Sequence, residues 1–149
     1  MISLVEITRS NWQECVSLSV SSEQKKFVAT NAYSLAESKY KPEWYPLGIS
    51  KDGKLIGFAM YGYDDDTETP WVIRFMLDEK QQGKGFGKEA FGELKNLLFD
   101  KYGQCDIRLC VVPDNFNAIR FYESFGFIST GEIFHGQTVY ELKNPNRAV

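Results

Sequence analysis

The chain has 149 residues, a formal net charge of −3 and 43% hydrophobic residues, which suits one folded domain with an apolar core and excludes a disordered segment. The acidic balance argues against nucleic-acid binding, which needs clustered Lys and Arg. No apolar run approaches the ~20 residues of a membrane helix, and the first residues do not resemble a signal peptide, so we expect a cytoplasmic protein that binds neither nucleic acid nor membrane.

The cysteine and histidine content argues against a metal site. Cys15, Cys105 and Cys110 are odd in number and lack metal-ligand spacing, and His135 is the only histidine. His135 stands in a run typical of a hairpin tip, so it is a surface residue rather than the partner of a nucleophilic cysteine. We therefore expect small core cysteines in a reducing cytoplasm and no metal cofactor.

The first half of the chain predicts two helices and a pair of strands. Asp52-Gly53 is a strong two-residue turn signal, so the runs on either side should pair antiparallel. The elements expected here are a strand at 2–7, helices at 8–18 and 22–39, and strands at 44–50 and 54–63. The second helix should bury an apolar stripe formed by Phe27, Val28, Ala32, Leu35 and Ala36.

A glycine-rich run in mid-chain stands between an apolar extended stretch, 71–77, and an amphipathic helix. Gly83, Gly85 and Gly87 occupy alternate positions, so the backbone can approach a ligand with no Cβ in the way. The helix after them offers unpaired N–H groups and the positive end of its dipole. Its apolar face is formed by Phe86, Ala90, Phe91, Leu94, Leu97 and Leu98. The combination predicts a phosphate or pyrophosphate site.

Two familiar phosphate loops do not fit this run. A Walker loop needs glycine where Gln82 stands and a hydroxyl where Glu89 stands. A dinucleotide fingerprint needs Gly-x-Gly-x-x-Gly near the start of a βαβ unit, whereas the spacing here is Gly-x-Gly-x-Gly. The run therefore belongs to another class of phosphate site.

A second motif lies in the last third of the chain. A strand-like run, 106–112, leads into Asn115 at a helix start, and Gly126 is a helix stop. A final hairpin should turn at His135-Gly136, and 145–149 should be a frayed tail. The order strand–helix–helix–strand–strand–strand–helix–strand–helix–strand–strand predicts one mixed sheet with helices on its faces.

Both motifs resemble those of one family. Gln82-x-x-Gly-x-Gly resembles the pyrophosphate loop, and Asn115-x-x-Ala-x-x-Phe-Tyr-Glu-x-x-Gly-Phe the second signature, of the GNAT superfamily of N-acetyltransferases. The resemblance implies a single α/β domain over 1–149, with a mostly antiparallel sheet of about seven strands and about four helices, and acetyl-CoA bound where central strands splay apart. It implies a set of cofactor-binding residues, namely Phe75, Leu77, Gln82, Gly83, Lys84, Gly85, Phe86, Gly87, Lys88, Asn115, Asn117, Ala118 and Tyr122.

Individual roles also follow from the resemblance. Asn115 would contact the pantetheine arm or order the loop, Ala118 would keep the helix surface low, and Tyr122 would donate a proton to the departing thiolate. From the residues alone, Asn115 is equally a helix cap and Tyr122 a core aromatic. Segments within 18–37, 57–61 and 74–78 resemble the bacterial spermine/spermidine and diamine acetyltransferases. That likeness implies acetyl transfer to a small polyamine or diamine by direct attack in a ternary complex.

The chemistry needs a proton acceptor, which the sequence leaves open. An alkylamine of pKa near 10.4 arrives charged at neutral pH, and removing its proton costs roughly 4 kcal/mol. The candidates for this base are Glu23, Glu37, Asp78 and the acidic run 64–68. Backbone N–H groups near Leu77 could polarise the carbonyl. Proton donation from a phenol near pKa 10 to a thiolate near 8.5 is uphill, so the site must lower the Tyr122 pKa or pass the proton through water.

The acceptor also has alternatives. The expected substrate contacts are Glu23, Glu37, Tyr61 and Trp71, and Tyr61 and Tyr63 should share one strand face. The residues alone favour a dipole contact at a helix start for Glu23 and a solvated loop for the acidic run, and the aromatics are equally core residues. The amine could instead be a protein N-terminus, a lysine, an aminoglycoside or an amino acid, or the domain could bind CoA without catalysis. A homodimer is one alternative for the oligomeric state.

Overall fold

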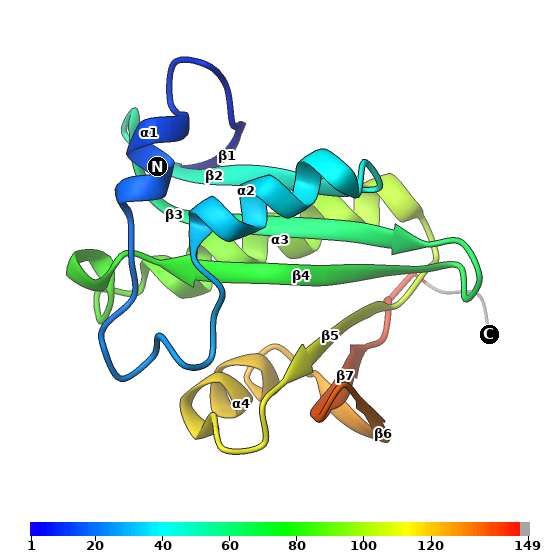
Figure 1. Ribbon diagram of the computed structural model, residues 1–149. Helices are drawn as coiled ribbons and strands as arrows, with labels where there is room; N and C mark the ends of the chain where they lie inside the picture. The colour runs from blue at the N-terminus through cyan, green and yellow to red at the C-terminus, as the bar shows by residue number, and fades with distance from the viewer. Residues whose placement is uncertain (147–149) are drawn as a thin grey trace. The chain divides into compact units, whose positions relative to one another are not determined.

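The computed structural model describes residues 1–146 of the chain. In this part, seven strands form a sheet in the order β1-β2-β3-β4-β5-β7-β6 (Figure 1). The strands are β1 (Ile2–Glu6), β2 (Trp44–Lys51), β3 (Lys54–Asp64), β4 (Thr69–Leu77), β5 (Ile107–Val111), β6 (Ile128–Phe134) and β7 (Gln137–Leu142). The helices are α1 (Trp12–Ser17), α2 (Asn31–Tyr40), α3 (Phe86–Tyr102) and α4 (Phe116–Glu123), with a 3-10 turn η1 (Glu79–Gln81).

The predicted mixed, mostly antiparallel α/β fold is confirmed. β1–β2, β2–β3, β5–β7 and β6–β7 pair antiparallel, and β4–β5 pair parallel. Both predicted hairpin turns are present, because Asp52-Gly53 and His135-Gly136 have positive φ angles of 51°, 84°, 50° and 77°. Of the tail expected at 145–149, residues 147–149 lie outside the described residues.

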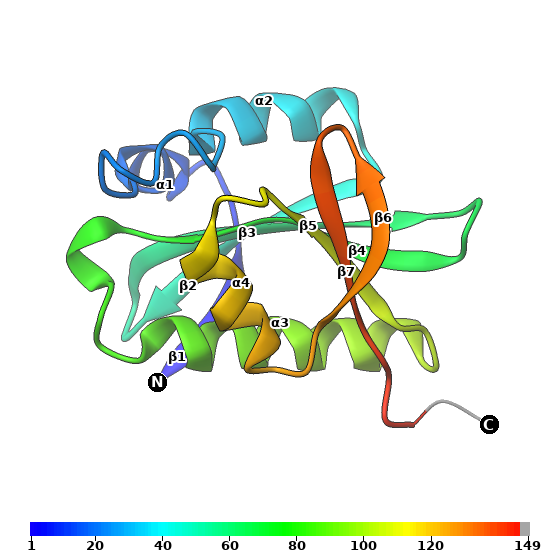
Figure 2. The ribbon, with the colours of Figure 1, turned by 90° about the horizontal axis from the view of Figure 1, so that it is seen from below.

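The chain divides into two compact units, so the single domain stays a prediction. The first unit holds residues 1–62 and 73–94, and the second holds 63–72 and the residues from 95 onward. In the first unit, α1 and α2 cover one face of β1–β3, and the start of α3 covers the other (Figure 2). A core of Cys15, Val20, Leu55, Phe58, Met60 and Met76 fills the α1/α2 side. On the other side, the ring of Phe75 packs edge-on against Phe91 with centroids 5.1 Å apart.

The prediction for α2 was wrong in extent and for part of the buried face, although Val28 and Leu35 of the expected stripe do pack against the core. The helix begins at Asn31 rather than near Ser22, because the Thr30 side chain accepts a hydrogen bond from the backbone N–H of Tyr33 (3.1 Å), and residues 22–27 form turns. Asn31 and Ser34 are buried, whereas Ala32 and Ala36 of the expected stripe are exposed. The buried side of the helix therefore combines Leu35 with the polar Asn31 and Ser34.

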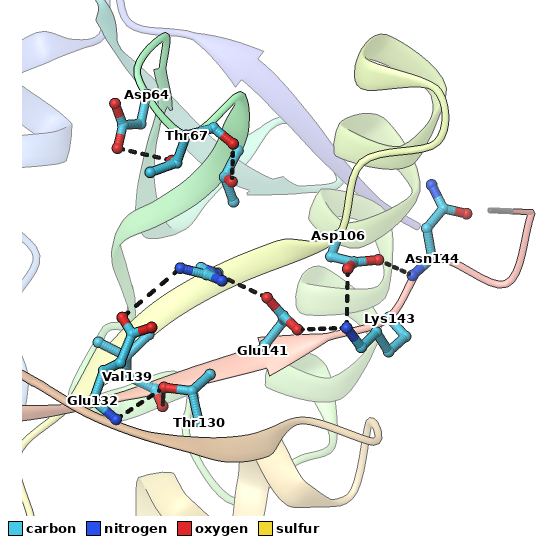
Figure 3. Close-up of polar contacts among 11 residues, drawn as sticks. Asp64, Thr67, Asp106, Thr130, Glu132, Val139, Glu141, Lys143 and Asn144 are labelled. Atoms are coloured by element: carbon cyan, nitrogen blue, oxygen red, sulfur yellow. Dashed lines mark hydrogen bonds and ion pairs between the residues drawn. The ribbon is translucent and has the colours of Figure 1, made fainter. Parts of the chain in front are cut away.

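The second unit is held together by a ladder of charged side chains (Figure 3). Arg108 donates from Nε to Oε2 of Glu141 (2.8 Å), its register partner on the adjacent strand. Lys143 reaches Oε1 of Glu141 (2.8 Å) and Oδ2 of Asp106 (3.4 Å). Burial alone would raise the pKa of Glu141, but hydrogen bonds from Lys143 and Arg108 outweigh it and lower that pKa. The ladder fixes the end of β7 beside the start of β5.

Two observations bear on the classes of protein considered above. No helix within residues 1–146 has both the length and the apolar character of a membrane span. In the same residues, no group of three or more His, Cys, Asp and Glu side chains could hold a metal ion. Cys15 is buried, Cys105 and Cys110 are half-buried, and His135 is exposed at its hairpin tip.

Candidate functional site

The glycine-rich run forms a braced loop between β4 and α3 in the first unit. Asp78 caps the η1 turn, since its Oδ2 accepts from the N–H of Lys80 (3.3 Å). Gln82 donates from Nε2 to the carbonyl oxygen of Leu77 and to Oε1 of Gln24, both at 3.0 Å. The Gln82 side chain therefore closes the loop on itself and fixes it to the segment before α2.

The loop conformation itself requires glycine. Gly83 and Gly85 have φ angles of 77° and 84°, in the region that L side chains rarely adopt. The first helical hydrogen bond of α3 runs from Glu89 N to Gly85 O, so the amides of Phe86, Gly87 and Lys88 precede the helical ladder. Lys84 and Lys88 are exposed beside them. Free amides, a helix dipole and two cations fit a pyrophosphate.

The second motif forms helix α4 in the second unit. Asn115 is its N-cap, with Oδ1 accepting from the N–H of Ala118 at 3.3 Å. Asn117 is exposed, and its Oδ1 accepts a hydrogen bond from Arg120 at 2.8 Å. The cap interpretation of Asn115 is thus confirmed, whereas cofactor contact by Asn115, Asn117 and Ala118 stays a prediction.

Tyr122 is half-buried on α4 among aromatic rings. Its ring centroid lies 5.3 Å from that of Phe121 and 5.8 Å from that of Phe127. Burial raises the pKa of the Tyr122 phenol above its ordinary value. Of the two alternatives taken from the sequence, a lowered Tyr122 pKa is therefore wrong, and passage of the proton through water stays a prediction. A phenol with a raised pKa keeps its proton and can donate a hydrogen bond to a thiolate, and the proton itself must arrive by another route.

The candidate bases differ in how their carboxylates are engaged. Both oxygens of Asp78 accept backbone N–H groups, from Ser19 (2.9 Å) and Lys80 (3.3 Å), so this side chain is a structural cap. Glu37 forms an ion pair with Arg74 at 2.7 Å. Glu23 is exposed in a turn and not at the helix start that the sequence predicted. Asp64 caps its own loop by accepting from Thr67 Oγ1 at 2.9 Å (Figure 3).

The aromatic candidates pack against other aromatics. In the first unit, Tyr61 is only 7% exposed and its ring lies 5.2 Å from that of Tyr45. Burial, and then the neighbouring Tyr45, raise the pKa of Tyr61. In the second unit, Trp71 lies 6.4 Å from the ring of Phe134. Little of Tyr61 is left for a substrate, whereas Trp71 is half-buried.

Sequence reasoning missed Gln24 and Arg74. Gln82, which donates to Gln24, lies 58 positions away along the chain, a pairing that no local pattern reveals. Arg74 could have been noticed, because an arginine inside an apolar strand needs a carboxylate partner. The structure provides that partner from α2, in Glu37.

Comparisons with known proteins agree with this geometry. A model of the acetyltransferase (GNAT) family matches residues 3–127. The chain is 35% identical over 145 residues to the spermine/spermidine N(1)-acetyltransferase of Bacillus subtilis strain 168, with 93% of this chain and 95% of that protein covered. The solved structure of AAC(6')-Ib with acetyl-CoA has a TM-score of 0.78 at 22% identity, over 97% of this chain and 93% of that one. The solved structure of spermidine N-acetyltransferase from Vibrio cholerae, with CoA and spermine, has a TM-score of 0.73 at 15% identity, over 95% of this chain and 93% of that one. These two likenesses show the fold alone.

Proposed function

The chain belongs to the acetyltransferase (GNAT) family and is an acetyl-CoA N-acetyltransferase, and we propose that its acceptor is a primary amine of a small polyamine or diamine. The observation that carries the acceptor is the 35% identity, over 93% of this chain, to a protein named spermine/spermidine N(1)-acetyltransferase. An acidic chain with net charge −3 suits a polycationic acceptor.

The braced glycine loop is the proposed site for the diphosphate of acetyl-CoA. The amides of residues 83–88 and the start of α3 would bind its oxygens, while Lys84 and Lys88 offset its charge. Gln82 supports the loop and does not need to contact the diphosphate, because its side-chain amide donates hydrogen bonds to Leu77 and Gln24. Acetyl-CoA supplies the thioester carbonyl and the thiolate leaving group, so this chain needs no covalent intermediate of its own.

The roles of the protein groups follow from the direct attack of an amine on a thioester. Main-chain N–H groups near Leu77, at the end of β4, would polarise the carbonyl. Tyr122 would donate a hydrogen bond to the leaving sulfur while keeping its proton. The acceptor nitrogen must lose a proton before it attacks, and water is the proposed carrier, because both oxygens of Asp78 accept backbone N–H groups.

A panel of acceptors tests the proposal. Purified protein is given acetyl-CoA with spermidine, spermine, putrescine, a lysine peptide, an N-terminal peptide, an amino acid or an aminoglycoside, and released thiol is measured. We expect the highest kcat/KM with spermidine or spermine. Turnover confined to the peptides, the amino acid or the aminoglycoside would remove the polyamine acceptor. CoA binding without turnover on any amine would favour a non-catalytic module.

A further inference from the structure

Helix α2 buries polar side chains beside Leu35, which packs against the apolar core of the first unit. Ala32, Tyr33 (59% exposed) and Ala36 are exposed to solvent. Asn31 (3% exposed) and Ser34 (0%) are buried. The fold keeps a polar layer formed by Asn31, Ser34, Glu37 and Arg74 beside this core, and Asn31 is held there by a bond to the carbonyl oxygen of Cys15 at 2.9 Å.

At the centre of this layer is the pair formed by Arg74 and Glu37. Nη2 of Arg74 donates to Oε1 of Glu37 at 2.7 Å, and Nη1 donates to the carbonyl oxygen of Ile73 at 3.0 Å. The side chains are only 22% and 19% exposed. Both Nη atoms of Arg74 are thus hydrogen-bonded, and Arg74 holds Glu37 by one oxygen. Among the described residues, no hydrogen bond occupies Oε2 of Glu37.

Two further polar atoms in this layer lack partners among the described residues. They are the hydroxyl of Ser34, on the same face of α2 as Glu37, and Nε of Arg74. Buried polar atoms without partners are rare, and a buried ion pair is seldom more stable than an apolar pair of the same size. The Ser34 hydroxyl and the second oxygen of Glu37 can accept hydrogen bonds from a cationic ligand, whereas the N–H at Nε of Arg74 is a donor that needs an acceptor or water.

We propose that Glu37 binds an ammonium group of the acceptor through its second oxygen, and that Arg74 is the positioning residue that orients it. This inference rests on the proposed function. Arg74 lies three residues before Leu77 on β4, about 10 Å along the strand. A carboxylate paired with Arg74, beside the strand that ends at the proposed carbonyl site, fits the charged nitrogen that does not react. The pair would then select diamines and polyamines over monoamines.

The test compares spermidine with butylamine, which has one nitrogen. In Glu37→Gln and Arg74→Met, KM for spermidine should rise about tenfold, because one charged hydrogen bond is lost or misplaced, while KM for acetyl-CoA and for butylamine stays within twofold. A purely structural pair would lower Tm without this split between the two amines. Lys25→Ala, at an exposed position in the turns before α2, is the control and should leave both KM values unchanged.

The double variant Glu37→Met/Arg74→Met guards against misfolding, because an apolar pair of similar volume preserves the packing. It should fold and show the same rise in spermidine KM as each single variant. Unchanged spermidine KM in folded Arg74→Met or in the double variant would overturn this inference. Failure of the unaltered protein to acetylate spermidine would instead defeat the proposed function.

Discussion

Nε2 of Gln82 lies 3.0 Å from both the carbonyl oxygen of Leu77 and Oε1 of Gln24. The two bonds join the end of β4, the glycine loop and the segment before α2. Ser21 N also donates to Oε1 of Gln24, at 3.3 Å. The glutamine that opens the loop motif is therefore a brace, and any effect it has on the cofactor passes through the position of the loop.

Replacing Gln82 by alanine should weaken CoA binding without removing a direct contact. Two hydrogen bonds at about 1 kcal/mol each set the loss at up to roughly 30-fold in Kd. Calorimetric titration with CoA measures it. Gln81→Ala is the matched control, because the neighbouring glutamine has no side-chain hydrogen bond among the described residues. Equal CoA affinity in the two variants would contradict the brace.

Asp78→Asn should separate a cap from a catalytic base. The amide keeps one acceptor oxygen, so about 1 kcal/mol of stability and roughly 2–4 °C in Tm should be lost. The rate at saturating amine should stay within about threefold, whereas loss of a general base typically costs 10²–10⁴-fold. A large fall in kcat with an unchanged Tm would restore Asp78 as the base.

Asn115→Ala should destabilise α4 by about 1 kcal/mol, because the helix loses its N-cap. Asn115→Ser restores a capping oxygen and should recover most of the lost Tm. Thermal unfolding and CoA titration are run on the same samples. If CoA affinity recovers with stability in the serine variant, Asn115 acts as a cap; affinity that stays low would support the predicted cofactor contact.

Tyr122→Phe should lower kcat by roughly 10–100-fold while leaving the Kd for CoA nearly unchanged. The reason is that a hydrogen bond to the leaving sulfur strengthens as charge develops there, and adds little to binding in the ground state. Pre-steady-state acetyl transfer and CoA titration give the two quantities. An unchanged rate would remove Tyr122 from the chemistry.

The pH dependence of stability follows from the same residue. Burial raises the pKa of Tyr122, so the folded state keeps the proton after the unfolded phenol begins to ionise near pH 10. The stability that the neutral phenol contributes is present below pH 10 and is lost as the pH rises above it. The Tm of the unaltered protein should therefore fall more steeply than that of Tyr122→Phe between about pH 9.5 and about pH 11. This interval brackets the ordinary phenol pKa of about 10. Parallel curves would show that the phenol is not buried in the neutral form.

Local signals predicted most of the fold. The Asp52-Gly53 and His135-Gly136 turns, the extent of α3 and the Asn115 cap depend on neighbours within a few positions, and each is present. The helix predicted over 22–39 begins too early, because the Thr30 cap starts the helix at Asn31. Which side of this helix is buried depends on partners in other elements. Asn31 is buried and donates a hydrogen bond to the carbonyl oxygen of Cys15, and Glu37 forms an ion pair with Arg74.

The amino-acid sequence by itself determined the glycine loop, the helix that follows it and the order of elements. Turn conformations and helical periodicity are properties of short segments. Only the tertiary structure decided that Gln82 braces the loop, that Asp78 is a cap, that burial raises the Tyr122 pKa and that Glu37 faces an arginine. Those outcomes depend on desolvation and on hydrogen bonds between residues distant in the chain, which exist only once the chain has folded.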